Sequence, residues 1–248
     1  MRSFGLGVLL LGLLASIAMA STQKNLDSAA KHEKIAFILV TDQGATGVDE
    51  AKDMIKQAMK QVKKTALIEL DRSDAANADL VAKYRLAGAP VPVILVVARN
   101  GVLAGGLPAA QATADKLVAM VPSPKKAEIL QVLQTGKAVF ISVSRKGMAS
   151  QSGATASCAA ACGQMKDQCS AVQIDMDDPE EAAFLGQMKV DLASTEPVTL
   201  VVNAQGQITG TYTGAADVAS LMQAATKKAG GCCPSTVQSG SKACGPAK

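Results

Sequence analysis

The residues best suited to chemistry are the cysteines, and three of the six fall within Ser157–Ser170, which reads SCAAACGQMKDQCS. On a helix, Cys158, Cys162, Met165 and Cys169 recur at spacings of four, three and four, which places them on one narrow stripe. Such a stripe is either a soft-ligand site or a face that packs into a core. The segment therefore supports two interpretations, thiol chemistry at Cys158 and Cys162 or burial of these residues as small apolar side chains.

The other three cysteines, Cys232, Cys233 and Cys244, lie in a C-terminal segment that is rich in Gly, Ser, Pro and Lys. We expect this segment to be flexible unless disulfides fix it. Because Cys232 and Cys233 are adjacent, they are poorly placed to bond each other. A second hypothesis is thiolate binding of Cu(I) or Zn(II). Its candidate ligands are all the cysteines of the chain: Cys158, Cys162, Cys169, Cys232, Cys233 and Cys244.

Composition narrows the class of protein. The chain has 248 residues, of which 48% are hydrophobic and only 2% aromatic, with a net charge of +4. This length supplies one large core or two smaller ones. Because aromatic platforms for stacking bases are nearly absent, we expect no nucleic-acid partner. The expected partner is a protein or a thiol substrate.

The N-terminus has the layout of a secretory signal. One arginine precedes an apolar run from Phe4 to Ala20, which ends in the small-x-small pattern Ala18-Met19-Ala20. We predict cleavage after this run, because it is at or below the length of about 17 residues that spans a bilayer. The mature chain is then exported, periplasmic or extracellular, and has no membrane span. Export matters because an oxidising compartment allows cysteines to pair.

The remainder of the chain contains an internal repeat. The run KIAFILVT that begins at Lys34 matches KAVFISVS from Lys137, and PVILVVARNG from Pro92 matches PVTLVVNAQG from Pro197. Between these strands each copy predicts a helix, a strand, an acidic turn and a second helix, and after them a short strand and a helix. A Pro-Ser-Pro stretch, residues 122–124, separates the copies. Helical crossovers require parallel strands, so each copy predicts a mixed α/β sheet covered on both faces.

This order of elements resembles the thioredoxin superfamily twice over, across about residues 26–228. The carrying features are the YRL or MKV segment before each proline-led strand and the N-G or Q-G turn after it. The resemblance implies cis peptide bonds at Pro92 and Pro197 and an active site beside them. Together with the apolar N-terminus and the composition of the C-terminal segment, it divides the chain into a signal peptide (1–20), a first domain without cysteine (21–121), a second domain (125–228) and a flexible cysteine-containing tail (229–248).

The sequence departs from this family at its redox motif. Neither copy has a Cys-x-x-Cys, and the loop Thr41–Val48 of the first copy has no cysteine at all. The second copy has Cys158-Ala-Ala-Ala-Cys162, with one residue too many between its thiols. That spacing is similar to the copper-delivering Sco family, in which a distant histidine completes the metal site. The one histidine here, His32, precedes the first strand of the other copy, which excludes such a site.

The residue at which the cysteine-containing helix begins distinguishes the two interpretations of the cysteines. If Ser157 is the N-cap, Cys158 lies in the first turn, where the helix dipole lowers its pKa. If the repeats align without gaps from Phe37 onto Phe140, the stripe faces the sheet. That alignment matches the four sulfur-bearing residues of the stripe, in order, to Ile55, Met59, Val62 and Ala66.

Two functions follow from the sequence. The first is an exported tandem thioredoxin-like protein that acts through thiols, by disulfide exchange at Cys158 and Cys162 beside Pro197 or by soft-metal binding. As an enzyme it would be an unusual thiol-disulfide oxidoreductase. The alternative is a non-catalytic module that binds a protein partner and uses its cysteines structurally.

Overall fold

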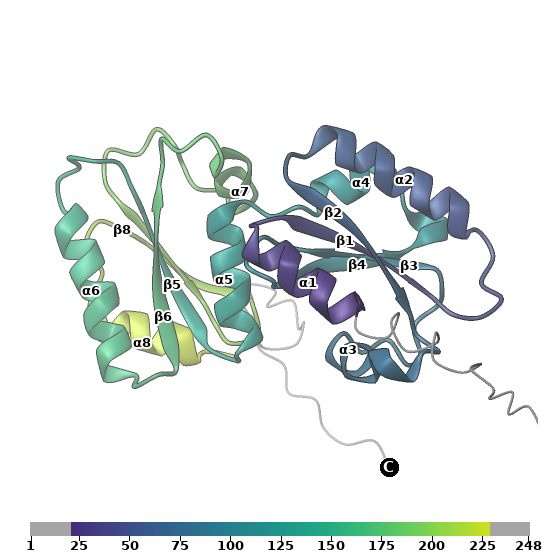
Figure 1. The fold of residues 1–248 in the computed structure, drawn as a ribbon. Helices are drawn as coiled ribbons and strands as arrows, with labels where there is room; N and C mark the ends of the chain where they lie inside the picture. Colours follow the sequence, from purple (N-terminus) through teal and green to yellow (C-terminus); the bar gives the residue numbers. More distant parts are fainter. Residues whose placement is uncertain (1–20, 229–248) are drawn as a thin grey trace, which may run out of the picture.

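The computed structural model describes residues 21–228, which form two consecutive α/β units (Figure 1). The predicted signal peptide, residues 1–20, and the predicted tail, residues 229–248 with Cys232, Cys233 and Cys244, lie outside the described residues. Among residues 21–228, no helix combines the length and the apolar character needed to cross a membrane.

The first unit runs from α1 to α4. Its helices and strands are α1 (Ser21–Lys31), β1 (Ile35–Thr41), α2 (Val48–Gln61), β2 (Thr65–Asp71), η2 (Ala75–Asn77), α3 (Ala78–Lys83), β3 (Val93–Val97), β4 (Leu103–Pro108), η3 (Ala109–Gln111) and α4 (Ala114–Ala119).

The second unit repeats this order from α5 to α8. Its elements are α5 (Pro124–Gln134), β5 (Ala138–Ser144), α6 (Gln151–Gln164), β6 (Cys169–Asp175), α7 (Ala182–Gln187), β7 (Val198–Val202), β8 (Ile208–Thr213) and α8 (Val218–Thr226).

The two sheets have the same topology. Their strand orders are β2-β1-β3-β4 and β6-β5-β7-β8. In each sheet the first two strands are parallel and joined by a helix, whereas the last two run antiparallel to the strand beside them. This topology confirms the predicted fold, two tandem thioredoxin-like domains with helices on both faces of a mixed sheet.

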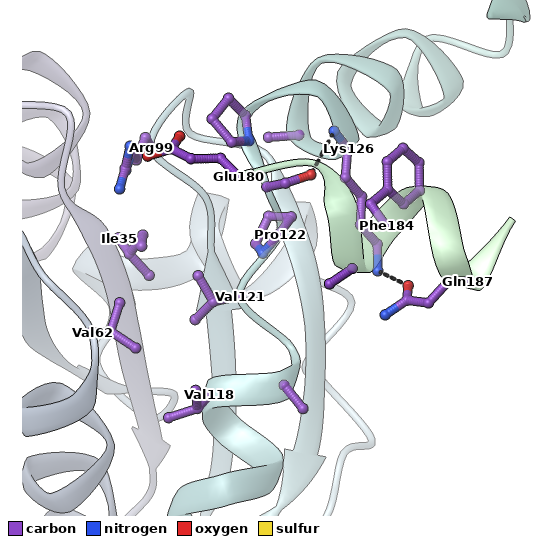
Figure 2. Close-up of a pocket in the computed structure, with 15 residues that line it drawn as sticks. Ile35, Val62, Arg99, Val118, Val121, Pro122, Lys126, Glu180, Phe184 and Gln187 are labelled. Carbon is purple, nitrogen blue, oxygen red and sulfur yellow. Dashed lines mark hydrogen bonds between the residues drawn. The ribbon is translucent and has the colours of Figure 1, made fainter. Parts of the chain in front are cut away.

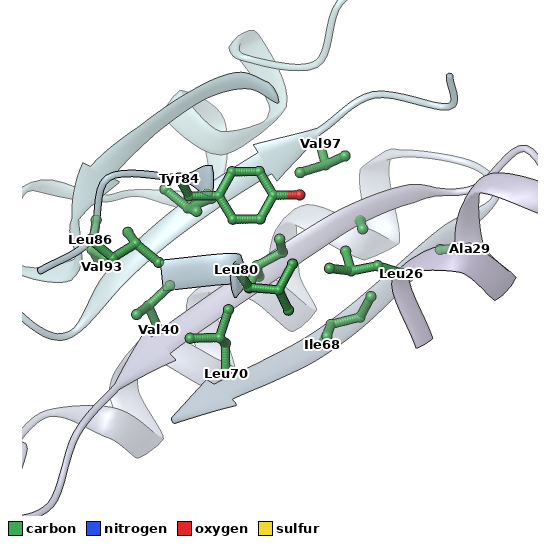
Figure 3. Close-up of a cluster of buried hydrophobic side chains, with 13 residues drawn as sticks. Leu26, Ala29, Val40, Ile68, Leu70, Leu80, Tyr84, Leu86, Val93 and Val97 are labelled. Atoms are coloured by element: carbon green, nitrogen blue, oxygen red, sulfur yellow. The ribbon is translucent and has the colours of Figure 1, made fainter. Parts of the chain in front are cut away.

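The central strand of each sheet is apolar because both of its faces are covered. β1 reads IAFILVT, and its first six residues are buried. Ala36, Ile38 and Val40 face the layer of α1 and α3, where they meet Leu26 and Leu80 (Figure 3). The alternate residues face α2 and α4. Because successive side chains of a strand point to opposite faces, the side chains of β1 enter two different cores.

The helix that follows each central strand begins after a residue in the left-handed region. Gly47 precedes α2 with a φ of 76°, and Ser150 precedes α6 with a φ of 63°. Glycine adopts this conformation without a steric penalty, whereas serine does so at some cost. The matched conformations show that the two loops turn in the same way despite different sequences.

The units contact each other through α5. The side chain of Asn100, in the β3–β4 turn of the first unit, donates to the Ala127 carbonyl of α5 at 2.9 Å. Gln134, at the end of α5, donates to the Leu103 carbonyl at 2.8 Å. Val102 packs against Ala127 in a small buried cluster. α5 therefore belongs to the second unit in sequence and also covers the edge of the first.

A buried carboxylate fixes the start of α5. Glu181 is fully buried and accepts hydrogen bonds from the Ser123 hydroxyl at 2.6 Å and from the Lys125 backbone N–H at 2.8 Å. A negative charge at a helix N-terminus is stabilised by free N–H groups and by the helix dipole. Glu181, which precedes α7, therefore caps a different helix that starts 57 residues earlier.

We predict that shortening a buried side chain of the second unit lowers the free energy of unfolding far more than shortening an exposed one. Leu200 is 2% exposed in β7, and Leu200→Ala should lower the free energy of unfolding by about 2–5 kcal/mol. The matched control is Ile208→Ala in the neighbouring β8, because Ile208 is 49% exposed and should cost less than about 1 kcal/mol. Urea unfolding of both variants measures the difference, and equal losses would contradict the assignment of this core.

Candidate functional site

The cysteine-rich helix begins well before the cysteines. α6 starts at Gln151, with Ser150 as its N-cap residue, so Cys158 is the eighth residue of a 14-residue helix. The interpretation in which Ser157 caps the helix and exposes Cys158 in the first turn is therefore wrong. The helix starts earlier because the left-handed Ser150, like Gly47 in the first unit, already turns the chain into it.

The alignment of the repeats explains the burial of Cys158. Its thiol is 1% exposed and packs with Phe140 and Leu221 in the core between α6, α8 and the sheet. Its counterpart in the first unit, Ile55, occupies the equivalent core. Burial raises the pKa of Cys158, because a thiolate loses its hydration there. Cys158 is thus a core residue with little thiolate character.

The stripe of sulfurs is not wholly helical. α6 ends at Gln164 with Met165 as its C-cap residue, and Cys169 is the first residue of β6, paired with Ala138. In the first unit Thr65, not Ala66, holds the equivalent pairing position. The connection from α6 to β6 is therefore one residue longer than that from α2 to β2. The gap-free alignment is correct through the helix and wrong at Cys169.

This extra residue places Cys169 beside Cys162. The two sulfur atoms lie 2.6 Å apart, with Cys169 buried and Cys162 half-buried. Burial raises the pKa of both thiols. The close contact between the thiols raises the pKa of Cys162 further, whereas this contact and the nearby Lys137 lower the pKa of Cys169. Cys169 is therefore the thiol that gives up a proton more readily.

Two polar side chains also enter the core next to Cys158. Ser142 of β5 and Thr199 of β7 are cross-strand partners, and both are almost fully buried on the face that α6 covers. Neither hydroxyl oxygen has a hydrogen-bonding partner in residues 21–228. Their counterparts in the first unit are the aliphatic residues Leu39 and Ile94. The second unit has thus replaced large apolar residues by smaller polar ones on this face.

Each loop that leads into α2 or α6 lacks a thiol. The loops between β1 and α2 and between β5 and α6, residues 42–47 and 145–150, contain no cysteine. The register of β5 with β6 puts Ala138 and Cys169 at one end of the sheet and Ser144 and Asp175 at the other. Cys162 and Cys169 therefore lie at the end opposite the loop at which thioredoxin-type chemistry takes place.

An arginine closes the loop end of the first unit. Arg72, just after β2, forms an ion pair with Asp42, just after β1. It also donates to the carbonyls of Leu86 and Ala89, at 3.0 and 2.6 Å, in the segment before β3. One side chain thus joins three loops that meet at this end of the sheet.

The second unit makes the same connection with the charges exchanged. Arg145 follows β5, at the position equivalent to Asp42, and donates to Asp177 at 2.7 Å. It also donates to the carbonyls of Leu192 and Ser194 in the segment before β7. The sequence predicts an acidic turn after the second strand of each copy, but these two arginines are not among the predicted site residues. The signal that could have found them is an arginine directly after a strand in each copy.

The prolines expected beside the site differ between the units. The Val91–Pro92 peptide bond is cis, as the resemblance implied. The same expectation for Pro197 is wrong, because Val91–Pro92 is the one cis bond among residues 21–228. The segment from Val190 to Pro197 is one residue longer than that from Leu86 to Pro92, and this longer segment reaches its strand through a trans bond. Both proline carbonyls still accept a backbone hydrogen bond at 2.8 Å.

The structure does not assemble the predicted metal ligands that it describes. Within residues 21–228, no group of three or more His, Cys, Asp or Glu side chains is placed to hold a metal ion. Cys158 lies in the core beside hydroxyl groups, whereas Cys162 and Cys169 contact each other. The other proposed ligands, Cys232, Cys233 and Cys244, fall outside these residues.

A cavity of about 430 Å³ lies where the two units meet (Figure 2). Ile35 and Val62 of the first unit line one side, and Phe184 of α7 lines the other. Lys126 lies 5.7 Å from the centre of the Phe184 ring and donates to Gln187 at 3.1 Å. The cysteines do not line this cavity.

No protein-family model matches the chain, and no curated protein sequence matches it. Several solved structures are similar to the chain at low identity. Zinc-bound human ERp44 is 10% identical with a TM-score of 0.35, over 80% of this chain and 55% of ERp44. The N-terminal domain of alkylhydroperoxide reductase AhpF from Enterococcus faecalis is 12% identical with a TM-score of 0.29, over 82% of this chain and 99% of that domain.

The first two thioredoxin domains of Saccharomyces cerevisiae Eps1p are 12% identical with a TM-score of 0.30, over 82% of this chain and 95% of that one. The chain spans about half the length of ERp44. The sheet topology defines the chain as a pair of thioredoxin-like domains, and neither domain carries a Cys-x-x-Cys.

We predict that the reduced protein loses stability in alkali because of its buried thiols. The pKa of Cys158 is raised in the folded state, so its thiol adds a constant stabilisation below about pH 9, the ordinary pKa. Above that pH the unfolded chain releases the proton first, and the free energy of unfolding falls by up to about 1.4 kcal/mol per pH unit for this thiol.

Urea unfolding between pH 7 and pH 10.5, with dithiothreitol present, measures this slope. Cys158→Ala should make the slope shallower. Leu185→Ala, which truncates a fully buried side chain of the same unit, should lower stability at every pH and leave the slope unchanged. The same slope in the wild type and in Cys158→Ala would show that the thiol is not buried in solution.

Proposed function

We propose that the chain is a non-catalytic, tandem thioredoxin-like protein-binding module whose cysteines are structural. One observation carries the proposal: the loop before α2 and the loop before α6 both lack a thiol. An arginine joins the surrounding loops in each unit, by hydrogen bonds to backbone carbonyls and an ion pair. The end of the sheet where a thioredoxin carries its reactive dithiol is occupied here by structural contacts.

The properties of the thiols support the same conclusion. Exchange requires an accessible thiolate, usually at a helix N-terminus, where the dipole lowers its pKa. Cys158 is 1% exposed, lies in the middle of α6 and has a raised pKa. Cys162 is half-buried in the last turn of α6, near the negative end of the dipole, and its pKa is also raised. Neither thiol is suited to act as a fast, catalytic nucleophile near neutral pH.

The contacts between the units suit a scaffold. α5 is hydrogen bonded to the β3–β4 turn through Asn100 and to β4 through Gln134, and Glu181 fixes the N-terminus of α5. The contacts of α5 therefore hold the two units together. A partner protein that binds both units would meet surfaces in a fixed arrangement. We further propose that the protein acts outside the cytoplasm, on the strength of the predicted signal at residues 1–20.

We predict that the protein does not catalyse disulfide reduction. The probe is insulin in the presence of dithiothreitol, whose reduction is followed by turbidity. The rate should equal that of dithiothreitol alone, because the pKa of each of the three thiols within residues 21–228 is raised. An acceleration that disappears in Cys158→Ala would contradict the proposal, and Leu185→Ala tests whether such a loss comes only from lower stability.

We also predict that partner binding survives removal of the two cysteines of the Cys-x-x-x-Cys segment. Full-length wild type and the Cys158→Ala/Cys162→Ala double variant are compared by photo-crosslinking in the host cell at a temperature where both are folded. The same crosslinked partners should appear with both proteins. A partner that depends on the thiols, at equal protein levels, would favour the thiol-dependent function instead.

One observation favours that second function, an exported protein that acts through thiols. Cys162 and Cys169 are in direct contact, although the first unit forms the same fold with Met59 and Thr65 at these positions. The fold itself therefore does not require two thiols at this corner. Soft-metal binding has less support, since no third ligand joins them within the part of the chain that the structure describes.

A further inference from the structure

The corner between α6 and β6 holds two thiols at fixed positions. Cys162 lies in the last turn of α6, and its sulfur is 2.6 Å from that of Cys169, the first residue of β6. The pairing of Cys169 with Ala138 fixes the strand, and the burial of Ala161 against the sheet fixes the helix. A disulfide bond is about 2.05 Å long, so a shift of roughly 0.6 Å joins the sulfurs.

The turn that connects these residues is tight. Lys166 and Asp167 both adopt a positive φ, of 42° and 54°, which reverses the chain between the helix and the strand. Such a turn brings residues seven apart in sequence next to each other without distorting α6 or β6. The backbone therefore already has the course that a cross-link between Cys162 and Cys169 requires.

Cys158 is a poorer partner for Cys162, although it completes the Cys-x-x-x-Cys segment. The two residues are four apart on α6, and side chains at this spacing have Cβ atoms about 5–6 Å apart. A disulfide needs Cβ atoms about 3.5–4.5 Å apart. In addition, Cys158 is enclosed in the core, where only 1% of it is exposed. The geometry favours the pair that crosses from helix to strand.

We propose that Cys162 and Cys169 form a reversible disulfide that closes the α6–β6 corner in an oxidising environment. The oxidant is a small-molecule disulfide of the glutathione class. The half-buried Cys162 attacks it as the thiolate, forms a mixed disulfide and releases one molecule of the small thiol. The Cys169 thiolate then attacks the Cys162 sulfur and releases the second. The protein loses two electrons and two protons, and the oxidant becomes two thiols.

The two thiols have different environments, and the order of steps uses this difference. Cys162 is the more exposed and is therefore the sulfur that a dissolved disulfide reaches first. Cys169 is buried beside it and receives a favourable contribution from the Lys137 charge, which helps it act as the second, resolving thiolate. Burial of both thiols makes the reaction slow near neutral pH, as expected of a structural cross-link rather than a catalyst.

The experiment is peptide mapping of the full-length protein after equilibration with oxidised glutathione and alkylation of the remaining thiols. Trypsin cleaves after Lys166, between the two cysteines, so a disulfide joins peptides 147–166 and 167–189 into one species. We expect this species in the wild type and in Cys158→Ala. It should be absent from Cys162→Ala and from wild type treated with dithiothreitol.

The second measurement is the difference in Tm between the oxidised and the reduced protein, which does not depend on any one variant. Closing a loop of about eight residues should raise the Tm of the oxidised wild type by about 5–10 °C over the reduced protein. Cys158→Ala should keep this difference, and Cys162→Met, which restores the residue type of Met59 in the first unit, should lose it.

Complete alkylation of Cys162 and Cys169 in the oxidised sample would overturn the proposal. So would a linkage of Cys169 to any other cysteine. The inference does not rest on the proposed binding function, because a disulfide can form whether or not the protein catalyses exchange. Failure here leaves the insulin and crosslinking results unaffected, so the two proposals fail separately.

Discussion

The pairing of a buried central strand with a parallel neighbour is the constraint on which both units depend. β1 and β5 are hydrogen bonded on both edges and covered on both faces, so their neighbours must arrive in one register. A parallel register also fixes where each connecting helix has to end. In the second unit the connection has one additional residue, and the register is kept by moving that residue into the turn. Cys169 reaches the first pairing position for this reason and lies against Cys162.

Comparison of the units shows which features the fold requires and which it leaves free. Both units join their loop ends by an arginine, but Asp42 and Arg72 exchange roles with Arg145 and Asp177. An ion pair is symmetrical in its two partners, so the exchange preserves the connection. The core under the second helix changes more, because it has smaller and more polar side chains. Its cost is two buried hydroxyl groups, on Ser142 and Thr199, without hydrogen-bonding partners within the described residues.

The strands and the fold could be predicted from the sequence because the spacing of apolar residues and the internal repeat both indicate which segments are buried. KIAFILVT and KAVFISVS are apolar on both faces, and their recurrence identified two copies of one unit. The burial of Cys158 followed from its alignment with Ile55. These signals are short sequence patterns, and each pattern occurs twice because the unit is repeated.

The contacts between distant segments could not be predicted in the same way. A single inserted residue after α6 changes the position of Cys169 but leaves the helical spacing intact, so the periodicity extended the helix too far. The cap that Glu181 provides to α5 joins residues 56 apart, and neither residue's neighbours indicate the other. The trans bond at Pro197 depends on the length of the segment before it. Only packing in three dimensions decides such features.

The asparagine in the turn after the third strand has a different partner in each unit. In the first unit, Asn100 donates to a carbonyl of α5, the opening helix of the next unit. In the second unit, the equivalent Asn203 donates instead to the carbonyl of Lys227, which directly follows α8. The same turn position thus joins the first unit to the helix of the second in one copy, and fixes the end of its own unit's last helix in the other. One type of side chain therefore serves as a contact between units and as a contact within a unit.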